Sequence, residues 1–144
     1  MQFQQIKKED HIKDVIKAAF DADFEIDGAW GYSEGEATII KKDSHTKEFQ
    51  HTLTSMRAYL EMNMTLSEDE RYGSINITEK SRNSSNNIDE ITYEISAMKE
   101  KEYNSFINEY KQGYGKSDFD MNKHFKKRQE ATLIREVKHF FKLI

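Results

Sequence analysis

The sequence of 144 residues contains no cysteine and no proline, and it has one tryptophan and six glycines. The absence of cysteine excludes disulfide bonds and all Cys-based zinc, redox or nucleophilic sites. No stretch approaches the roughly 20 apolar residues of a membrane span, and the N-terminal segment lacks the apolar core of a signal peptide. We therefore expect a cytoplasmic protein without a membrane segment.

The common signatures of catalysis are also missing. The sequence has no Gly-x-Ser-x-Gly nucleophile motif, no glycine loop for phosphates and no dinucleotide fingerprint. His45, Glu48 and His51 are spaced at i, i+3 and i+6, which spreads them more widely around a helix than the i, i+4 histidine pair of zinc-binding helices. The sequence therefore predicts no catalytic residue, no metal site and no cofactor.

Charge is divided unevenly along the chain. The net charge is −4, but residues 114–144 carry eight basic and four acidic side chains. Basic residues surround phenylalanines between Lys123 and Lys142, as they do in surfaces that bind phosphates. Because Glu130 and Glu136 lie inside this cluster and the whole chain is acidic, we expect no nucleic-acid partner.

Hydrophobic periodicity predicts a mixed architecture. Apolar residues at helical spacing predict helices at residues 10–20, 45–58 and 103–113, and a further helix after Ser117. Alternation with a period of two predicts strands at residues 60–66, 75–78 and 91–95. A chain of this length can bury one hydrophobic core. We therefore predict a single α+β domain over residues 1–144.

The predicted sheet is antiparallel, with a meander around residues 60–97 that helices cover on one face. The last segment, residues 131–144, is left open by its pattern. One set of apolar residues fits a helix: Leu133, Val137, Phe140 and Ile144. Another fits a strand: Ala131, Leu133, Val137, Phe141 and Leu143.

The stretch DADFEIDGAWGYSE, residues 21–34, has acidic side chains at every second position before its glycines. Counted from Asp23, its spacing resembles the EF-hand calcium loop, which implies ligands from Asp23, Glu25, Asp27 and Glu34. The alternation also fits a half-buried strand whose carboxylates face water, with Phe24 and Ile26 on the inner side. We favour the strand, since it accounts for the apolar residues as well.

Gly28 and Gly31 flank the only tryptophan of the chain. Trp30 and Tyr32 offer flat surfaces with a polar tip, and the glycines allow another segment or a ligand to approach closely. Trp30 is expected either to anchor the core or to form a binding surface. The candidate ligand-binding set comprises Trp30, Tyr32, Asp23, Glu25 and Asp27.

These observations favour a non-catalytic interaction or regulatory module of the cytoplasm that acts through a protein partner or through self-association. The alternative is a small-molecule-binding protein or a hydrolytic enzyme with a site near Trp30 and the three carboxylates. The two hypotheses differ in their structural requirements. A ligand site needs a concave pocket with convergent polar groups. An interaction module needs an exposed apolar patch.

Overall fold

The computed structural model describes residues 3–43 and 46–144. Its five-stranded sheet has the order β1-β2-β5-β4-β3. The strands are β1 (Asp27–Gly28), β2 (Thr38–Ile40), β3 (Tyr72–Ser85), β4 (Ile88–Lys99) and β5 (Leu133–Leu143). The helices are α1 (Ile12–Phe20), α2 (Thr46–Asn63), α3 (Glu100–Gly113) and α4 (Met121–Ala131), with single 3₁₀ turns η1 (Glu34–Glu36) and η2 (Glu68–Glu70). The α+β class is therefore confirmed.

Strands β3 and β4 form a long antiparallel hairpin, as their alternation predicts. Asn86 and Asn87 make the turn with φ values of 52° and 62°, the left-handed conformation that two-residue hairpin turns require. Strand β5 pairs antiparallel with β4 and parallel with the short β2, so the sheet is mixed but mostly antiparallel. Of the segment 131–144, Ala131 still belongs to α4, and Leu133–Leu143 form a strand rather than a helix.

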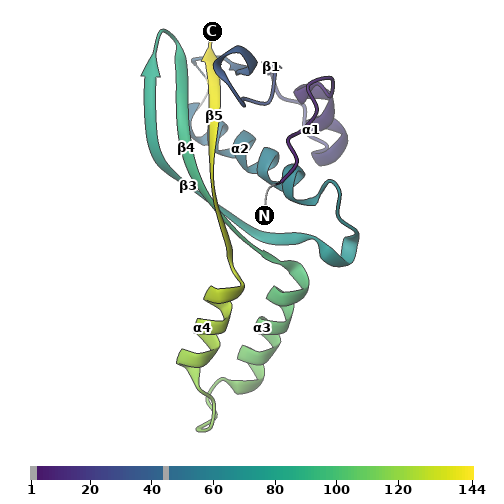
Figure 1. Ribbon diagram of the computed structural model, residues 1–144, viewed down its shortest axis with the longest axis vertical. Coiled ribbons are helices and arrows are strands. Elements are labelled where there is room, and N and C mark those ends of the chain that lie inside the picture. The colour runs from purple at the N-terminus through teal and green to yellow at the C-terminus, as the bar shows by residue number, and fades with distance from the viewer. Residues whose placement is uncertain (1–2, 44–45) are drawn as a thin grey trace.

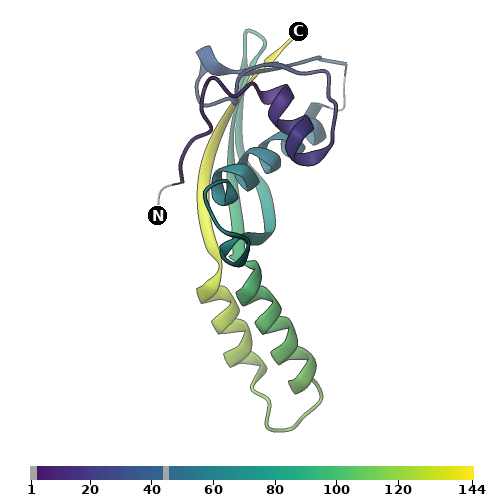
Figure 2. The same ribbon diagram turned by 90° about the vertical axis from the view of Figure 1, so that its right-hand side faces the viewer.

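Helices α1 and α2 cover one face of the sheet (Figures 1 and 2). Ile16 of α1, Leu53 of α2, and Ile91 and Ile95 of β4 are all fully buried and belong to one hydrophobic core. The other face of β4 carries Thr92, Glu94 and similar polar groups and is only half-buried. The prediction that helices cover one face is therefore confirmed.

The α3–α4 hairpin interrupts the sheet between β4 and β5. Ala97 pairs with Leu133, so the two strands are still neighbours where the hairpin begins. The hairpin extends away from the rest of the molecule, at the end opposite the C-terminus (Figure 1). We call everything outside residues 100–131 the body. The two strands therefore hold both ends of the hairpin.

The predicted strand at residues 60–66 is wrong. Helix α2 continues to Asn63, beyond the predicted end at residue 58. The Asn63 side chain accepts a hydrogen bond from the Tyr72 backbone N–H (2.7 Å) and donates one to the Tyr72 carbonyl (3.1 Å). The backbone N–H and carbonyl at the start of β3 are thus hydrogen-bonded by a side chain at the end of a helix, where we expected a neighbouring strand.

The acidic stretch is only partly a strand. Asp27 and Gly28 form β1, whereas residues 21–26 have no strand neighbour. Burial still alternates, since Ile26 is buried and the acids on either side are exposed.

Among the described residues, no helix combines the length and apolar character that crossing a membrane requires.

Candidate functional site

Trp30 and Tyr32 lie side by side at the edge of the body, and both are held by hydrogen bonds. Trp30 is only 2% exposed, and its indole N–H donates to the Asp10 carbonyl (2.9 Å). The Tyr32 hydroxyl accepts from the Ile6 backbone N–H (3.0 Å) and donates to a Glu61 carboxylate oxygen (2.5 Å). Both line a hollow of about 270 Å³. Trp30 thus anchors the core while one edge of it borders this hollow.

The three predicted carboxylates do not reach that hollow. Asp23, Glu25 and Asp27 are exposed, and each lies near a basic side chain. The partners are Lys13 at 3.9 Å, Lys41 at 2.7 Å and His11 at 3.2 Å, in that order. The hydrogen bond from Lys41 lowers the pKa of Glu25, and the Gly28 backbone N–H lowers that of Asp27. The structure therefore separates the acidic part of the predicted site from its aromatic part.

Beneath Tyr32 lies a buried ionic cluster that the sequence did not reveal. The Arg57 guanidinium lies 3.4 Å from Glu61, and Arg135 donates to the same carboxylate at 3.0 Å. Arg57 also donates to the Trp30 carbonyl (3.2 Å) and stacks on the Tyr32 ring. Burial raises the pKa of Tyr32 and lowers that of Arg57. The cluster fastens the Trp30 segment to α2 and β5.

His139 forms a second buried polar centre, at the middle of β5. Its ring nitrogens lie 2.9 Å from the hydroxyls of Thr38 and Thr54. Its ring stacks on Phe141, and a Cβ at Gly31 would come within 2.0 Å of it. Burial first, and then the nearby positive charge of Arg57, hold the pKa of His139 well below 6.5. This neutral, fully enclosed imidazole has the properties of a structural group.

No metal centre is found among residues 3–43 and 46–144, where no three His, Asp or Glu side chains are suitably grouped. Of His45, Glu48 and His51, whose spacing is wider than that of zinc-binding helices, His45 lies outside the described residues. His51 is exposed on α2, and its ring makes a T-shaped contact with that of Tyr93.

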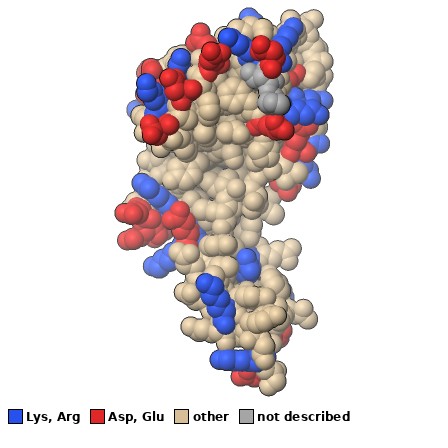
Figure 3. All heavy atoms as spheres, turned by 180° about the vertical axis from the view of Figure 1, so that it is seen from behind, with Lys and Arg blue, Asp and Glu red and all other residues tan. Residues whose placement is uncertain are grey.

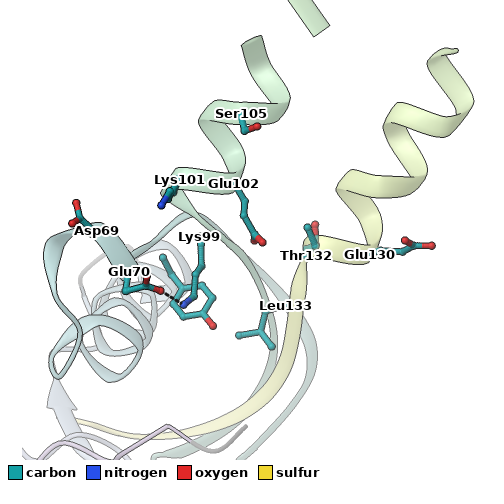
Figure 4. Close-up of a pocket in the computed structure, with 11 residues that line it drawn as sticks. Asp69, Glu70, Lys99, Lys101, Glu102, Ser105, Glu130, Thr132 and Leu133 are labelled. Carbon is teal, nitrogen blue, oxygen red and sulfur yellow. Dashed lines mark hydrogen bonds and ion pairs between the residues drawn. The ribbon is translucent and has the colours of Figure 1, made fainter. Parts of the chain in front are cut away.

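A further concavity lies at the neck between body and hairpin (Figure 4). This hollow, of about 720 Å³, is bordered by η2, the junction of β4 with α3, and the junction of α4 with β5. Lys99 donates to Glu70 (2.6 Å) and lies over the Tyr72 ring. The hydrogen bond lowers the pKa of Glu70 and raises that of Lys99. The hollow is open and mixed in charge, which gives it little selectivity for one ligand.

One side of the hairpin is aromatic. Tyr103 and Arg128 line a groove of about 460 Å³ at its base, Tyr110 contacts Phe125 and Tyr114, and Arg128 lies over Phe125. Tyr114 is 69% exposed and Phe125 is 47% exposed. We define the aromatic side of the hairpin as Tyr103, Ile107, Tyr110, Tyr114, Met121, Phe125 and Arg128.

The opposite side of the hairpin is polar. Lys127 donates to Glu109 (2.9 Å), and this bond lowers the pKa of Glu109. Ser105 and Glu109 border a hollow there, and Ser105 also lines the neck hollow together with Glu130. The polar side comprises Ser105, Glu109, Gln112, Lys123, Lys127 and Glu130. The hairpin therefore has two chemically distinct surfaces.

Between the two sides, the helices meet at His124. Its side chain is fully buried, and aromatic rings surround it from Phe106, Tyr110, Phe119 and Phe125. Its Nδ1 lies 3.4 Å from Glu109. The sequence does not reveal this packing, because the neighbours of His124 on α3 are more than ten residues away along the chain.

Comparison with protein-family models, with curated proteins and with solved structures finds no match for this chain. The geometry of the site alone therefore supports the functional inference.

Proposed function

We propose that the protein is a non-catalytic interaction module of the cytoplasm, and that it binds a protein through the aromatic side of the α3–α4 hairpin. The observation that supports this proposal is the exposure of Tyr114 and Phe125 on an element that extends beyond the body. Tyrosine, phenylalanine and arginine are enriched at protein interfaces. Tyrosine and arginine are also common among the residues that contribute most to affinity.

The body acts as the support of this surface. Strands β4 and β5 pair up to the start of the hairpin, so both helices leave the sheet from fixed positions. A surface held in this way loses little conformational freedom when a partner binds, and affinity benefits accordingly. The hairpin face visible in Figure 3 also carries fewer charged side chains than the upper part of the body.

The alternative, a small-molecule site beside Trp30 and Tyr32, has a narrower basis. The hollow there measures about 270 Å³, whereas ligand pockets usually have roughly 300 to 1,000 Å³. Its lining includes Lys7, Lys8 and Glu36 but none of the three predicted carboxylates. We therefore place the binding surface on the hairpin.

Site-specific photo-crosslinking tests the proposal. p-Benzoylphenylalanine replaces Phe125 on the aromatic side or, as a matched control, Phe140 on β5, and the variants are irradiated in the cells that naturally make the protein. We expect discrete adducts of higher mass from position 125 and not from position 140. Equal patterns from both positions, or no adduct from position 125, would rule out the hairpin as the binding surface.

A further inference from the structure

The aromatic side has the spacing of a helix bundle. Tyr103, Ile107 and Tyr110 follow one another on α3 at i, i+4 and i+7, and Tyr114 directly after the helix continues this spacing at i+11. Met121, Phe125 and Arg128 repeat the first three of these steps on α4. This seven-residue repeat is the one by which helices pack at about 20° in coiled coils and four-helix bundles. In a four-helix bundle, the apolar stripe of one pair of helices is covered by the other pair.

The hairpin buries little within itself. In its two helices, all of whose residues the structure describes, only Gly113 and His124 are buried. The helices have 14 and 11 residues, and helices of fewer than about 12 to 15 residues are marginal unless tertiary packing supports them. A covering layer would supply that packing.

We propose that this layer is the hairpin of a second copy of the chain, and that the two hairpins form an antiparallel four-helix bundle about a twofold axis. This inference rests on the proposed function, since it names the partner of the same surface. In this arrangement α3 lies against α3 of the second copy, and α4 lies against its α4. The second copy presents a stripe of identical length and spacing, as an isologous interface requires.

Charge complementarity favours the antiparallel orientation. Glu100 lies at the neck end of α3 and Lys111 near its tip, 11 residues apart and thus on the same face of the helix. When two α3 helices run in opposite directions, Lys111 of each copy faces Glu100 of the other. The pairing also sets the dipoles of the facing helices in opposite directions.

The registers of the two helices agree with this axis. His124 lies between Phe106 and Tyr110, so the middle of α4 is level with the middle of α3. A single twofold axis can therefore pass through the centre of the α3–α3 pair and the centre of the α4–α4 pair. It brings Tyr114 at the tip level with the β4–α3 junction of the second copy, where the groove of about 460 Å³ lies. Figures 1 and 2 show the hairpin as narrower than the body, and the head-to-tail arrangement keeps the two bodies apart.

Engineered cysteines test this arrangement without background, because the chain has none of its own. Asn122 and Gln129 are seven residues apart on the face of α4 that borders the groove, and Lys123 and Glu130 are seven apart on the polar side. Single variants N122C and Q129C are mixed and oxidised mildly, and K123C with E130C is the control mixture. Each single variant is also oxidised alone.

We expect a disulfide-linked N122C–Q129C dimer at about ten times or more the yield of the control mixture, since a specific dimer raises the effective thiol concentration. Equal yields from both mixtures would overturn the proposal. Stronger crosslinking of N122C with itself would overturn the antiparallel arrangement.

Sedimentation equilibrium provides the second measurement. The native chain should be a concentration-dependent dimer in the micromolar range, Phe125→Ser should shift it to monomer, and Gln112→Ser on the polar side should not. A native chain that is monomeric throughout that range overturns the proposal of a second copy. In that case, photo-adducts from position 125 whose mass differs from twice that of the chain would mean that the hairpin binds a different protein, and the proposed function would stand. If position 125 gives no adducts, the proposed function and the proposed dimer both fail.

Discussion

The body and the α3–α4 hairpin use the same kinds of side chain in opposite ways. In the body, Trp30 and Phe141 are enclosed by the core, whereas Tyr114 and Phe125 on the hairpin face the solvent. The body also buries charge. Glu61 is 5% exposed and contacts two arginines, while the ion pair of Glu109 with Lys127 lies on the hairpin surface.

This difference separates stability from recognition. Aromatic rings and ion pairs that are enclosed define the arrangement of β5, α2 and the Trp30 segment. Comparable groups on the hairpin contribute little to that core and so remain available for a partner.

The largest difference is expected between two glutamates. Glu61→Ala leaves Arg57 buried without its carboxylate, and breaking a buried ion pair costs about 3 to 5 kcal/mol. Glu109→Ala removes the exposed pair with Lys127, for which about 0 to 1 kcal/mol is typical, together with the 3.4 Å contact to His124. Urea denaturation of both variants measures the free energies of unfolding. Similar losses would mean that the buried cluster does not stabilise the body.

A second pair compares two isoleucines. Ile91 is fully buried in β4, so Ile91→Ala should lower the free energy of unfolding by about 2 to 5 kcal/mol. Ile107 on α3 is half-buried, so Ile107→Ala should cost well under half of that loss under conditions where the protein is monomeric. Thr92→Ala, on the open face beside Ile91, is the control and should cost far less than Ile91→Ala. Equal losses at Ile91 and Thr92 would contradict the observed register.

A third prediction concerns pH and the buried His139. Its pKa in the folded protein lies well below 6.5, the ordinary value expected in the unfolded chain. Below about pH 6.5 the unfolded chain therefore binds more protons than the folded protein. The free energy of unfolding should fall by up to about 1.4 kcal/mol per pH unit as the pH decreases from there. Above pH 7 this contribution is constant.

Comparison with His139→Asn isolates that contribution, because the other titratable groups are unchanged. Denaturation midpoints of both proteins are measured between pH 7 and pH 5. The native chain should lose stability more steeply than the variant. Parallel slopes would show that His139 titrates normally.

The sequence predicted the regular elements better than the site. Helices α1, α3 and α4 and the β3–β4 hairpin follow from periodicity, because each presents one clear apolar face. The alternation from Leu60 to Leu66 led to the wrong prediction of a strand, since four apolar residues at every second position also occur where a helix ends in a loop. Helix α2 extends there because Asn63 bonds Tyr72, a contact that only the folded chain creates.

The predicted site illustrates the same limit. Trp30 and Tyr32 line a hollow, but the direction in which the neighbouring carboxylates point depends on where β1 pairs. Arg57 and Glu61 have the i, i+4 spacing that is common for ion pairs on helix surfaces, yet both are buried, and Tyr32 and Arg135 contact the Glu61 carboxylate. The two different sides of the hairpin can be predicted only if α3 and α4 are known to be neighbours, and the periodicity of each helix alone does not indicate this.

The smallest effect on stability is expected from removal of the whole hairpin. Replacing residues 100–131 with Asn-Gly joins β4 directly to β5, whose strands are already paired at Ala97 and Leu133. Antiparallel strands accept such short connections. Since the core residues all lie in the body, we expect its free energy of unfolding to change by about 1 kcal/mol or less, the range of changes remote from a core. Thermal unfolding followed by circular dichroism measures this. The same variant should be monomeric, and a body that unfolds without the hairpin would show that scaffold and binding element are one cooperative unit.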